Sequence, residues 1–262
     1  MIIDHCYFIL FTMANTYQAP IVKKAFTILN AIAKSPQGLR ISDIASLLNI
    51  SKSTVHGIMA ALSEQGAVIK SSASKRYVIG MTLMELGKAA HERIDFKNIA
   101  RPIMEELMEQ CQESVFLGIQ NGNRVTIIDI VESRKDFKIT SPIGTALPLL
   151  AGATGKLFLS RMDPENLHKY LNSNPLRKFT SNTIIDPEQY IRELDRVRKD
   201  GFAYDDEEYI SGVRAVAAPI KQHGAYIPAI WVVGFKASMA TGKIPAIIKQ
   251  TRAAAVKISS SI

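Results

Sequence analysis

Apolar residues recur at spacings of three and four along the first third of the chain, which predicts a series of short helices. The first helix is expected to begin near Ile21 and to bury a stripe made of Val22, Phe26, Leu29, Ile32 and Ala33. The Ser-Pro-Gln-Gly run at 35–38 is expected to end it. A second helix is expected to be capped by Ser42, to end at Asn49 and to bury Ile44, Ala45, Leu47 and Leu48.

The third helix has clear boundary signals. Ser51 or Ser53 is expected to cap its N-terminus, and Gly66 is expected to close it. Its apolar stripe consists of Val55, Ile58, Met59 and Leu62. Two short apolar runs follow at 67–70 and 77–79, and the polar tip between them predicts a hairpin. Three helices and a hairpin predict a winged helix-turn-helix domain, with a dimerisation or protein-docking domain as the alternative.

Short hydroxyl side chains and one cation stand at the exposed start of the third helix, and such groups suit contacts to phosphates and base edges. The residues expected to face a DNA major groove are Ser51, Lys52, Ser53, Thr54 and His56. Lys70, Lys75 and Arg76 of the hairpin are expected to contact backbone phosphates, and Arg40 is assigned to the same DNA-binding set. For His56, a capping or packing role is the alternative.

Positive charge is concentrated in the same segment. Residues 21–80 contain eight Lys or Arg and two Asp or Glu, a net charge of +6, whereas the rest of the chain carries only +2. Such asymmetry favours a small module that binds a polyanion, although a solvated basic face gives the same count. We therefore predict double-stranded DNA as a partner.

Composition excludes two broad classes of protein. The chain is 47% hydrophobic, so it can bury a core and is not expected to be disordered. No stretch approaches the ~20 apolar residues that cross a bilayer, so no membrane partner is predicted. Two cysteines, Cys6 and Cys111, are too few for a disulfide framework, and a cytoplasmic location is expected.

The chain is expected to divide into four parts. Residues 1–20 resemble a signal peptide only faintly, because Asp4 and His5 interrupt the segment and the apolar run at 6–11 is short. We interpret them as an N-terminal extension, with Met13 as the true start. The winged helix-turn-helix domain is expected at 21–80, a linker helix at 81–96 and a larger domain at 97–262.

Strand-like and helix-like segments are interleaved in the larger domain. Strands are expected at 115–120, 125–131, 137–140, 213–220 and 227–235, and helices at 99–111, 154–161, 164–171, 187–199 and 244–258. The first two strands flank an Asn-Gly-Asn turn at 121–123. The whole chain is therefore predicted to be α+β, with a largely antiparallel sheet covered by helices.

Motif searches favour a protein without catalytic activity. The glycine-rich run at 152–156 is not a P-loop, because Leu150 replaces the first glycine and Leu157 replaces the magnesium-binding Ser or Thr. Its backbone N–H groups at 153–155 can still hold an anion. The five histidines lack metal-ligand spacing. The acidic run at 205–208 is interpreted as a solvated loop, with cation binding or acid–base chemistry as the alternative, and no cofactor or metal is predicted.

Short motifs occur in order along both expected domains: AFTIL at 25–29, SKSTVH at 51–56, YVIG at 77–80, PIG at 142–144, TGK at 154–156, GFAYDDEE at 201–208, GVR at 212–214 and AAPI at 217–220. Together they resemble the IclR family of bacterial and archaeal transcriptional regulators. The resemblance implies a winged-helix head, a linker helix with Leu83, Leu86 and Ala90 on one face, and a GAF-like effector-binding domain. It also implies homodimers or dimers of dimers that bind pseudo-palindromic operators under the control of a small-molecule effector.

The same resemblance, together with the helix start at 153–155, indicates an effector pocket. Its expected residues are Ala153, Thr154, Gly155, Asp205, Val213, Ala215, Trp231 and Val233. The chain departs from the family at Gly57, where arginine is usual, and at Trp231 and Val233, where serines are common.

Two outcomes follow from the exchange of serines for Trp231 and Val233. Either the pocket accepts a more apolar ligand stacked on Trp231, or Trp231 fills the pocket. We expect an effector that is a small organic acid with an apolar or aromatic body. The alternative function is a GAF-like small-molecule-binding or enzymatic protein whose head docks protein rather than DNA.

Overall fold

The computed structural model describes residues 19–92, 96–221 and 227–262. Backbone contacts divide the chain into a unit that ends at Ile94, here called the head, and a unit that begins at Asp95, here called the sheet unit. The expected start at Met13 and the rest of residues 1–18 lie outside the described residues.

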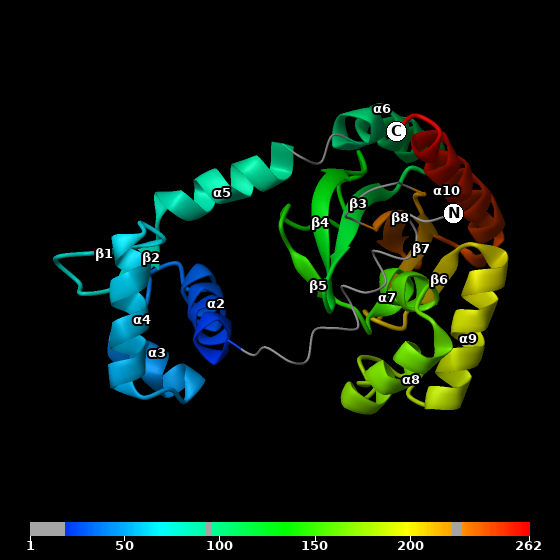
Figure 1. Ribbon diagram of the computed structural model, residues 1–262. Coiled ribbons are helices and arrows are strands. Elements are labelled where there is room, and N and C mark those ends of the chain that lie inside the picture. The colour runs from blue at the N-terminus through cyan, green and yellow to red at the C-terminus, as the bar shows by residue number, and fades with distance from the viewer. Residues whose placement is uncertain (1–18, 93–95, 222–226) are drawn as a thin grey trace, which may run out of the picture. The chain divides into compact units, whose positions relative to one another are not determined.

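The head has the elements that the sequence predicts (Figure 1). They are α2 (Pro20–Ala33), α3 (Ile41–Leu48), α4 (Lys52–Glu64), β1 (Val68–Lys70), β2 (Tyr77–Ile79) and α5 (Met81–Glu92). The strands β1 and β2 pair in antiparallel register and form the expected wing. An isolated bridge joins Leu39 to Tyr77 and so ties the wing to the segment before α3.

The buried face of α2 differs from the predicted one. Val22 and Phe26 are 50% and 62% exposed, whereas Ile28 is fully buried. Two overlapping stripes of α2 have helical spacing, and contact with α3 and α4 selects the stripe that contains Ile28, Leu29 and Ile32. Sequence periodicity alone does not distinguish these stripes. Ala33 of α2 and Leu47 of α3 were also predicted to be buried, and both are exposed because they lie outside the faces that pack in the head.

Helix boundaries in the head follow local capping chemistry. Arg40, not Ser42, is the N-cap of α3, and its N–H donates to the Asp43 carboxylate at 3.1 Å. Asn49 ends α3 in the left-handed conformation, as expected. In the helix that follows the wing, Leu83 packs against the head core but Leu86 is exposed. The predicted apolar face of the linker is therefore broken at Leu86.

The sheet unit is built on one antiparallel sheet with the order β5-β4-β3-β8-β7-β6, which confirms the α+β prediction. Its elements are α6 (Phe96–Cys111), β3 (Ser114–Asn121), β4 (Arg124–Val131), β5 (Ala146–Pro148), α7 (Gly152–Leu159), α8 (Pro164–Ser173), α9 (Pro187–Asp200), β6 (Ala203–Asp206), β7 (Val213–Pro219), β8 (Pro228–Phe235), a 3₁₀ turn (Thr241–Lys243) and α10 (Ile244–Ser259). The helices α6 and α10 lie side by side against the sheet (Figure 1).

Strand positions alternate between two packed faces of this sheet. Phe116, Ala217 and Trp231 pack in one core with apolar residues of α7, α8 and α9. The register places Trp231 opposite Phe116 on one side and Ala217 on the other, and it places Ala215 between Asp205 and Val233. Two neighbouring rows of the sheet thus bring together side chains that are far apart in the sequence.

The strand predicted at 137–140 is wrong. Phe137 is 85% exposed, and the edge of β4 pairs instead with β5, with Val125 opposite Leu147. Side-chain bonds hold the 137–140 segment, since Thr140 Oγ1 donates to Glu132 at 2.5 Å and Lys138 lies 2.9 Å from the same carboxylate. The strands β5 and β6 have only three and four residues, so the sequence pattern missed them.

Candidate functional site

The start of α4 presents the residues predicted to contact DNA. Ser51 is the N-cap, and its Oγ accepts from the Thr54 N–H at 3.2 Å. The hydroxyls of Ser53 and Thr54 lie 3.1 and 2.8 Å from the same Oγ. Lys52, Ser53 and His56 are exposed, whereas Thr54 is half-buried. Ser51 and Thr54 therefore stabilise the helix start, and Lys52 and His56 extend beyond it.

A groove runs beside this surface, between α2 and α4. Ser53, Thr54 and Gly57 line it together with Val22 and Ala25. Among the described residues, apart from the neighbouring backbone of α4, no heavy atom lies within 4 Å of the point where a Cβ at Gly57 would stand. A Cβ at this position would consequently meet no steric barrier.

The two arginines of the predicted DNA-binding set have partners within the head. Arg40 Nε donates to the Ser74 carbonyl at 3.2 Å, and Arg76 Nη1 donates to the Gly38 carbonyl at 2.9 Å. Arg76 also lies 3.6 Å from the Asp43 carboxylate. Both arginines therefore fasten the wing to the segment around α3. We call this pair of contacts the wing clamp.

The two lysines of the wing differ from the arginines. Lys70 Nζ lies 5.6 Å from the centre of the Tyr77 ring, in the range of a cation–π contact. Lys75 is exposed at the tip, and its φ of 59° places it in the left-handed region. The tip therefore presents at least one cation that the wing clamp does not use.

The sheet unit holds a cavity of about 220 Å³, here called the effector cavity. Seven of the eight predicted pocket residues line it: Ala153, Thr154, Asp205, Val213, Ala215, Trp231 and Val233. The exception is Gly155, whose N–H donates to the Ala151 carbonyl at 3.2 Å. A Cβ at Gly155 would collide with the Leu149 carbonyl, so glycine there allows a close approach of two backbones.

Several lining residues were not foreseen from the sequence. They are Phe116, Ile127, Ile139, Thr140, Ser141, Leu147, Ala151, Gly152, Tyr209 and Ile210. Phe116 and Ile127 lie on strands that the sequence pattern did predict. Their positions along these strands were the only sequence signal that could have placed them in the cavity lining. The segments at 139–141 and 209–210 are loops, for which periodicity gives no contact information.

Trp231 forms one wall of the effector cavity and does not fill it. The side chain is buried, and its ring stacks on Phe116 with 5.6 Å between centroids and 10° between planes. Gly118 makes room for it, because a Cβ there would lie 2.6 Å from the indole Cη2. The expectation that Trp231 fills the pocket is therefore wrong: the indole belongs to the core and also lines the cavity.

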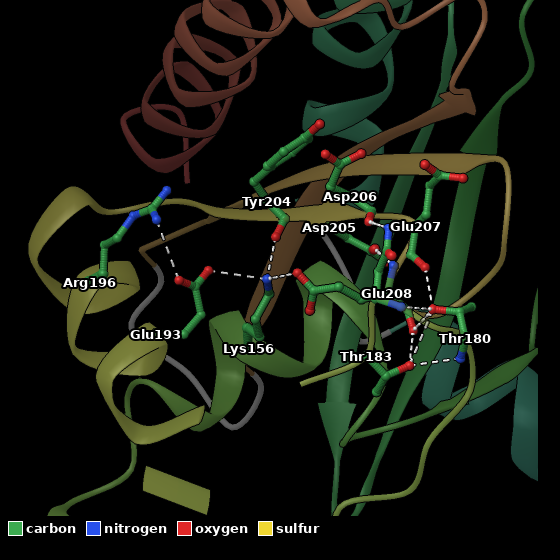
Figure 2. Close-up of polar contacts among 11 residues, drawn as sticks. Lys156, Thr180, Thr183, Glu193, Arg196, Tyr204, Asp205, Asp206, Glu207 and Glu208 are labelled. Carbon is green, nitrogen blue, oxygen red and sulfur yellow. Dashed lines mark hydrogen bonds and ion pairs between the residues drawn. The ribbon is translucent and has the colours of Figure 1, made fainter. Parts of the chain in front are cut away.

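The acidic run at 205–208 is not a solvated loop. Asp205 is 5% exposed, lines the cavity and accepts a 2.6 Å hydrogen bond at Oδ1 from the Glu208 N–H. Burial raises the pKa of Asp205 to about 6. Glu208 Oε1 lies 2.6 Å from Lys156 Nζ, which also contacts Glu193 (Figure 2). Burial likewise raises the pKa of Glu208, and the nearby ammonium opposes that rise.

The described ranges contain no cluster of three or more His, Cys, Asp or Glu side chains able to hold a metal ion. Every helix in them is too short or too polar to cross a lipid bilayer.

A winged helix-turn-helix head joined in one chain to a domain with a largely apolar cavity defines a DNA-binding regulator of the ligand-responsive class. Two family models match this chain: "IclR helix-turn-helix domain" over residues 21–71 and "Bacterial transcriptional regulator IclR C-terminal" over residues 88–260. The chain belongs to the IclR family of transcriptional regulators.

Individual relatives agree with this assignment. The transcriptional regulator KipR of Bacillus subtilis is 31% identical over 242 residues, which are 92% of this chain and 96% of KipR. The IclR structure of Thermotoga maritima is 32% identical, with a TM-score of 0.65 over 93% of this chain and 99% of that one. An IclR homologue from Microbacterium hydrocarbonoxydans, solved with 4-hydroxybenzoate, is 21% identical, with a TM-score of 0.73 over 92% of this chain and 98% of that one.

Proposed function

We propose that this regulator senses a small organic acid with an apolar or aromatic body, which binds in the effector cavity and changes the affinity of the head for its operator. The observation that carries the proposal is the lining of the cavity. Phe116 and Trp231 provide a stacked aromatic wall, and Ile127, Val213 and Val233 add aliphatic surface. An apolar lining with a few polar groups is the usual character of a small-molecule site.

The acid group of the ligand is assigned to the start of α7. The first N–H groups of a helix have no carbonyl partner within the helix, and the helix dipole favours an anion there. Ala151 caps α7 without a side-chain hydrogen bond, and Ala153 and Thr154 line the cavity. Because the Gly155 N–H donates to Ala151, we limit the acid-binding groups to the backbone before Gly155. The homologue solved with 4-hydroxybenzoate supports an aromatic acid as the first candidate.

The size of the cavity restricts the ligand further. A volume of about 220 Å³ lies below the ~300–1,000 Å³ of pockets that hold drug-sized molecules. A single ring with one acid group is therefore the expected scale of the part of the ligand that the cavity holds.

A titration tests the proposed ligand class. Trp231 is the single tryptophan of the chain, so its fluorescence reports on the cavity wall. Benzoate and 4-hydroxybenzoate are expected to change this fluorescence and also the affinity for operator DNA. Acetate lacks the ring and benzyl alcohol lacks the acid, so both are expected to bind more weakly. A silent response to both aromatic acids, with the fold intact, would contradict the proposal.

For the head, we propose that Ser51, Lys52, Ser53, Thr54 and His56 face the major groove and that Lys70 and Lys75 contact phosphates. The exposure of Lys52, His56 and Lys75 supports these roles. We assign Arg40 and Arg76 chiefly to the wing clamp, since both already have partners in the head. Anisotropy of duplex DNA from upstream of the gene, against a scrambled duplex at two salt concentrations, tests the whole set.

We further propose that the protein binds a pseudo-palindromic operator as a homodimer or a dimer of dimers. Sedimentation with and without operator DNA tests this assembly. For the domains, we propose the boundaries expected from the sequence. The relatives named as transcriptional regulators support a role without enzymatic activity. A cytoplasmic location follows from the need to reach the chromosome.

A further inference from the structure

Lys156 lies in α7, a few residues beyond Ala153 and Thr154, which line the effector cavity. It does not line the cavity itself, and only 1% of its surface is exposed. Removing an ammonium group from water is costly unless partners satisfy its donors. The burial of Lys156 beside the cavity therefore requires acceptors for its N–H groups.

Three acceptors surround the ammonium group, which has three donors to offer (Figure 2). Nζ donates to Glu208 Oε1 at 2.6 Å, to Glu193 Oε1 at 3.2 Å and to the Tyr204 carbonyl. Glu193 lies on α9 and is also 3.6 Å from Arg196. Lys156 thus links three elements, α7, α9 and the end of β6, and has no N–H left for a ligand.

One of these acceptors belongs to a wall of the effector cavity, and a second comes directly before it in the chain. We call residues 205–212 the acidic wall, because Asp205, Tyr209 and Ile210 line the cavity from this segment. Tyr204 immediately precedes the acidic wall, and Glu208 lies inside it. The Glu208 N–H in turn holds the Asp205 carboxylate at 2.6 Å. Lys156 is therefore connected to the cavity through one intermediate residue.

Threonine hydroxyls fix the same segment from its other side. Thr180 Oγ1 donates to the Glu207 carbonyl at 2.6 Å, and Thr183 Oγ1 donates to the Glu208 carbonyl at the same distance (Figure 2). These bonds fix the backbone of the acidic wall. Lys156 instead contacts the Glu208 side chain and the Tyr204 carbonyl, which directly precedes the wall. The ammonium of Lys156 opposes the rise in the pKa of Glu208 that its partial burial causes.

We propose that Lys156 is a positioning residue of the effector cavity: its buried ammonium group holds the acidic wall in place and thereby sets the affinity for the effector. The second half of this statement rests on the proposed function. The first half concerns the protein without ligand and can be tested without one.

The test compares three variants of the full chain. Lys156→Met removes the charge and keeps the length of the side chain. Lys156→Met/Glu208→Gln removes both charges of the pair and serves as the second variant if Lys156→Met folds poorly. It leaves no unpaired carboxylate, because Glu193 keeps Arg196 as a partner. Lys169→Met is the matched control, because Lys169 forms an exposed ion pair with Glu165 on α8.

Hydrogen exchange gives the readout that needs no ligand. The Glu207, Glu208 and Gly212 amides of the acidic wall all donate hydrogen bonds in the structure. In both Lys156 variants their protection is expected to fall by about tenfold, while the amides of β8 and the Lys169→Met control stay unchanged. Asp205 provides a second signal in Lys156→Met, which keeps the Glu208 charge: without the nearby ammonium the pKa of Asp205 is expected to rise further, which carboxyl NMR detects and a pure packing role would not produce.

Binding of 4-hydroxybenzoate then separates the possible failures. A weakening of about tenfold in both Lys156 variants, together with lost protection, supports the proposal. Unchanged protection in both variants overturns it, whatever the ligand is. Lost protection with unchanged affinity overturns the link to the effector. If the wild type does not bind the probe, the proposed ligand class fails, and the exchange data alone decide whether Lys156 holds the acidic wall.

Discussion

Asp205→Asn is expected to stabilise the sheet unit at neutral pH. The carboxyl is buried beside the effector cavity, and its pKa rises from 3.8 to about 6 in the folded protein. Between these two values the folded state binds the proton and the unfolded chain does not. Stability therefore falls as the pH rises through this window, and the loss is complete above pH 6.

The size of the effect follows from the same two numbers. One pKa unit is worth 1.36 kcal/mol, so the gap between 3.8 and about 6 corresponds to about 3 kcal/mol. Asparagine removes this pH-dependent loss. It also keeps an oxygen that can accept from the Glu208 N–H, which donates to Asp205 at 2.6 Å. Asp205→Asn is consequently expected to gain up to about 3 kcal/mol at pH 7 over the wild type, and the gain is expected to vanish near pH 4.

Guanidinium unfolding measured at several pH values provides the assay. Trp231 is the single tryptophan, so its fluorescence follows the sheet unit and not the head. Asp195→Asn on the exposed surface of α9 is the control, and it should change stability by less than ~0.5 kcal/mol at every pH. A gain from Asp205→Asn that is independent of pH, or a loss of stability at pH 7, would refute the reasoning.

Three further predictions concern single contacts. Ser51→Ala should destabilise the head by about 1 kcal/mol through loss of the N-cap, seen as faster exchange of the Thr54 amide, while Ser53→Ala should have little effect. Lys75→Ala should weaken binding to all duplexes and reduce the salt slope by about 1; an unchanged slope would remove the wing tip from the interface. Gly118→Ala should destabilise the sheet unit by about 1–3 kcal/mol, because its Cβ would lie 2.6 Å from the indole, and chemical denaturation should show no such loss for Gly242→Ala.

Local signals in the sequence were sufficient for most of the head. Ser51 and Asn49 mark helix boundaries through their own side-chain and backbone chemistry, and both act as predicted. The buried face of α2 was not decided in this way, because Phe26 and Ile28 belong to two stripes of equal periodicity. Only contact with the other helices distinguishes them.

The effector cavity shows a different limit of sequence analysis. Positions such as Ala215 and Trp231 were reached through a family resemblance, and the sheet register explains why both line the cavity: they lie on the neighbouring strands β7 and β8, where Ala215 pairs with Val233 and Trp231 with Ala217. The burial of Lys156 was not foreseen, since its carboxylate partners lie 37 and 52 residues away. The sequence around a lysine near a glycine-rich turn does not show whether its ammonium group lies in solvent or is buried against carboxylates from distant segments.

The wing clamp has a consequence for the thermodynamics of DNA binding. Each phosphate that a protein cation neutralises releases counterions and contributes about 0.9 to the salt slope. Arg40 and Arg76 count toward the net charge of +6 in residues 21–80, yet both already donate to carbonyls of the head. The salt slope should therefore be shallower than this charge suggests. The same contacts order the wing before DNA binds, so the wing loses less conformational entropy on binding.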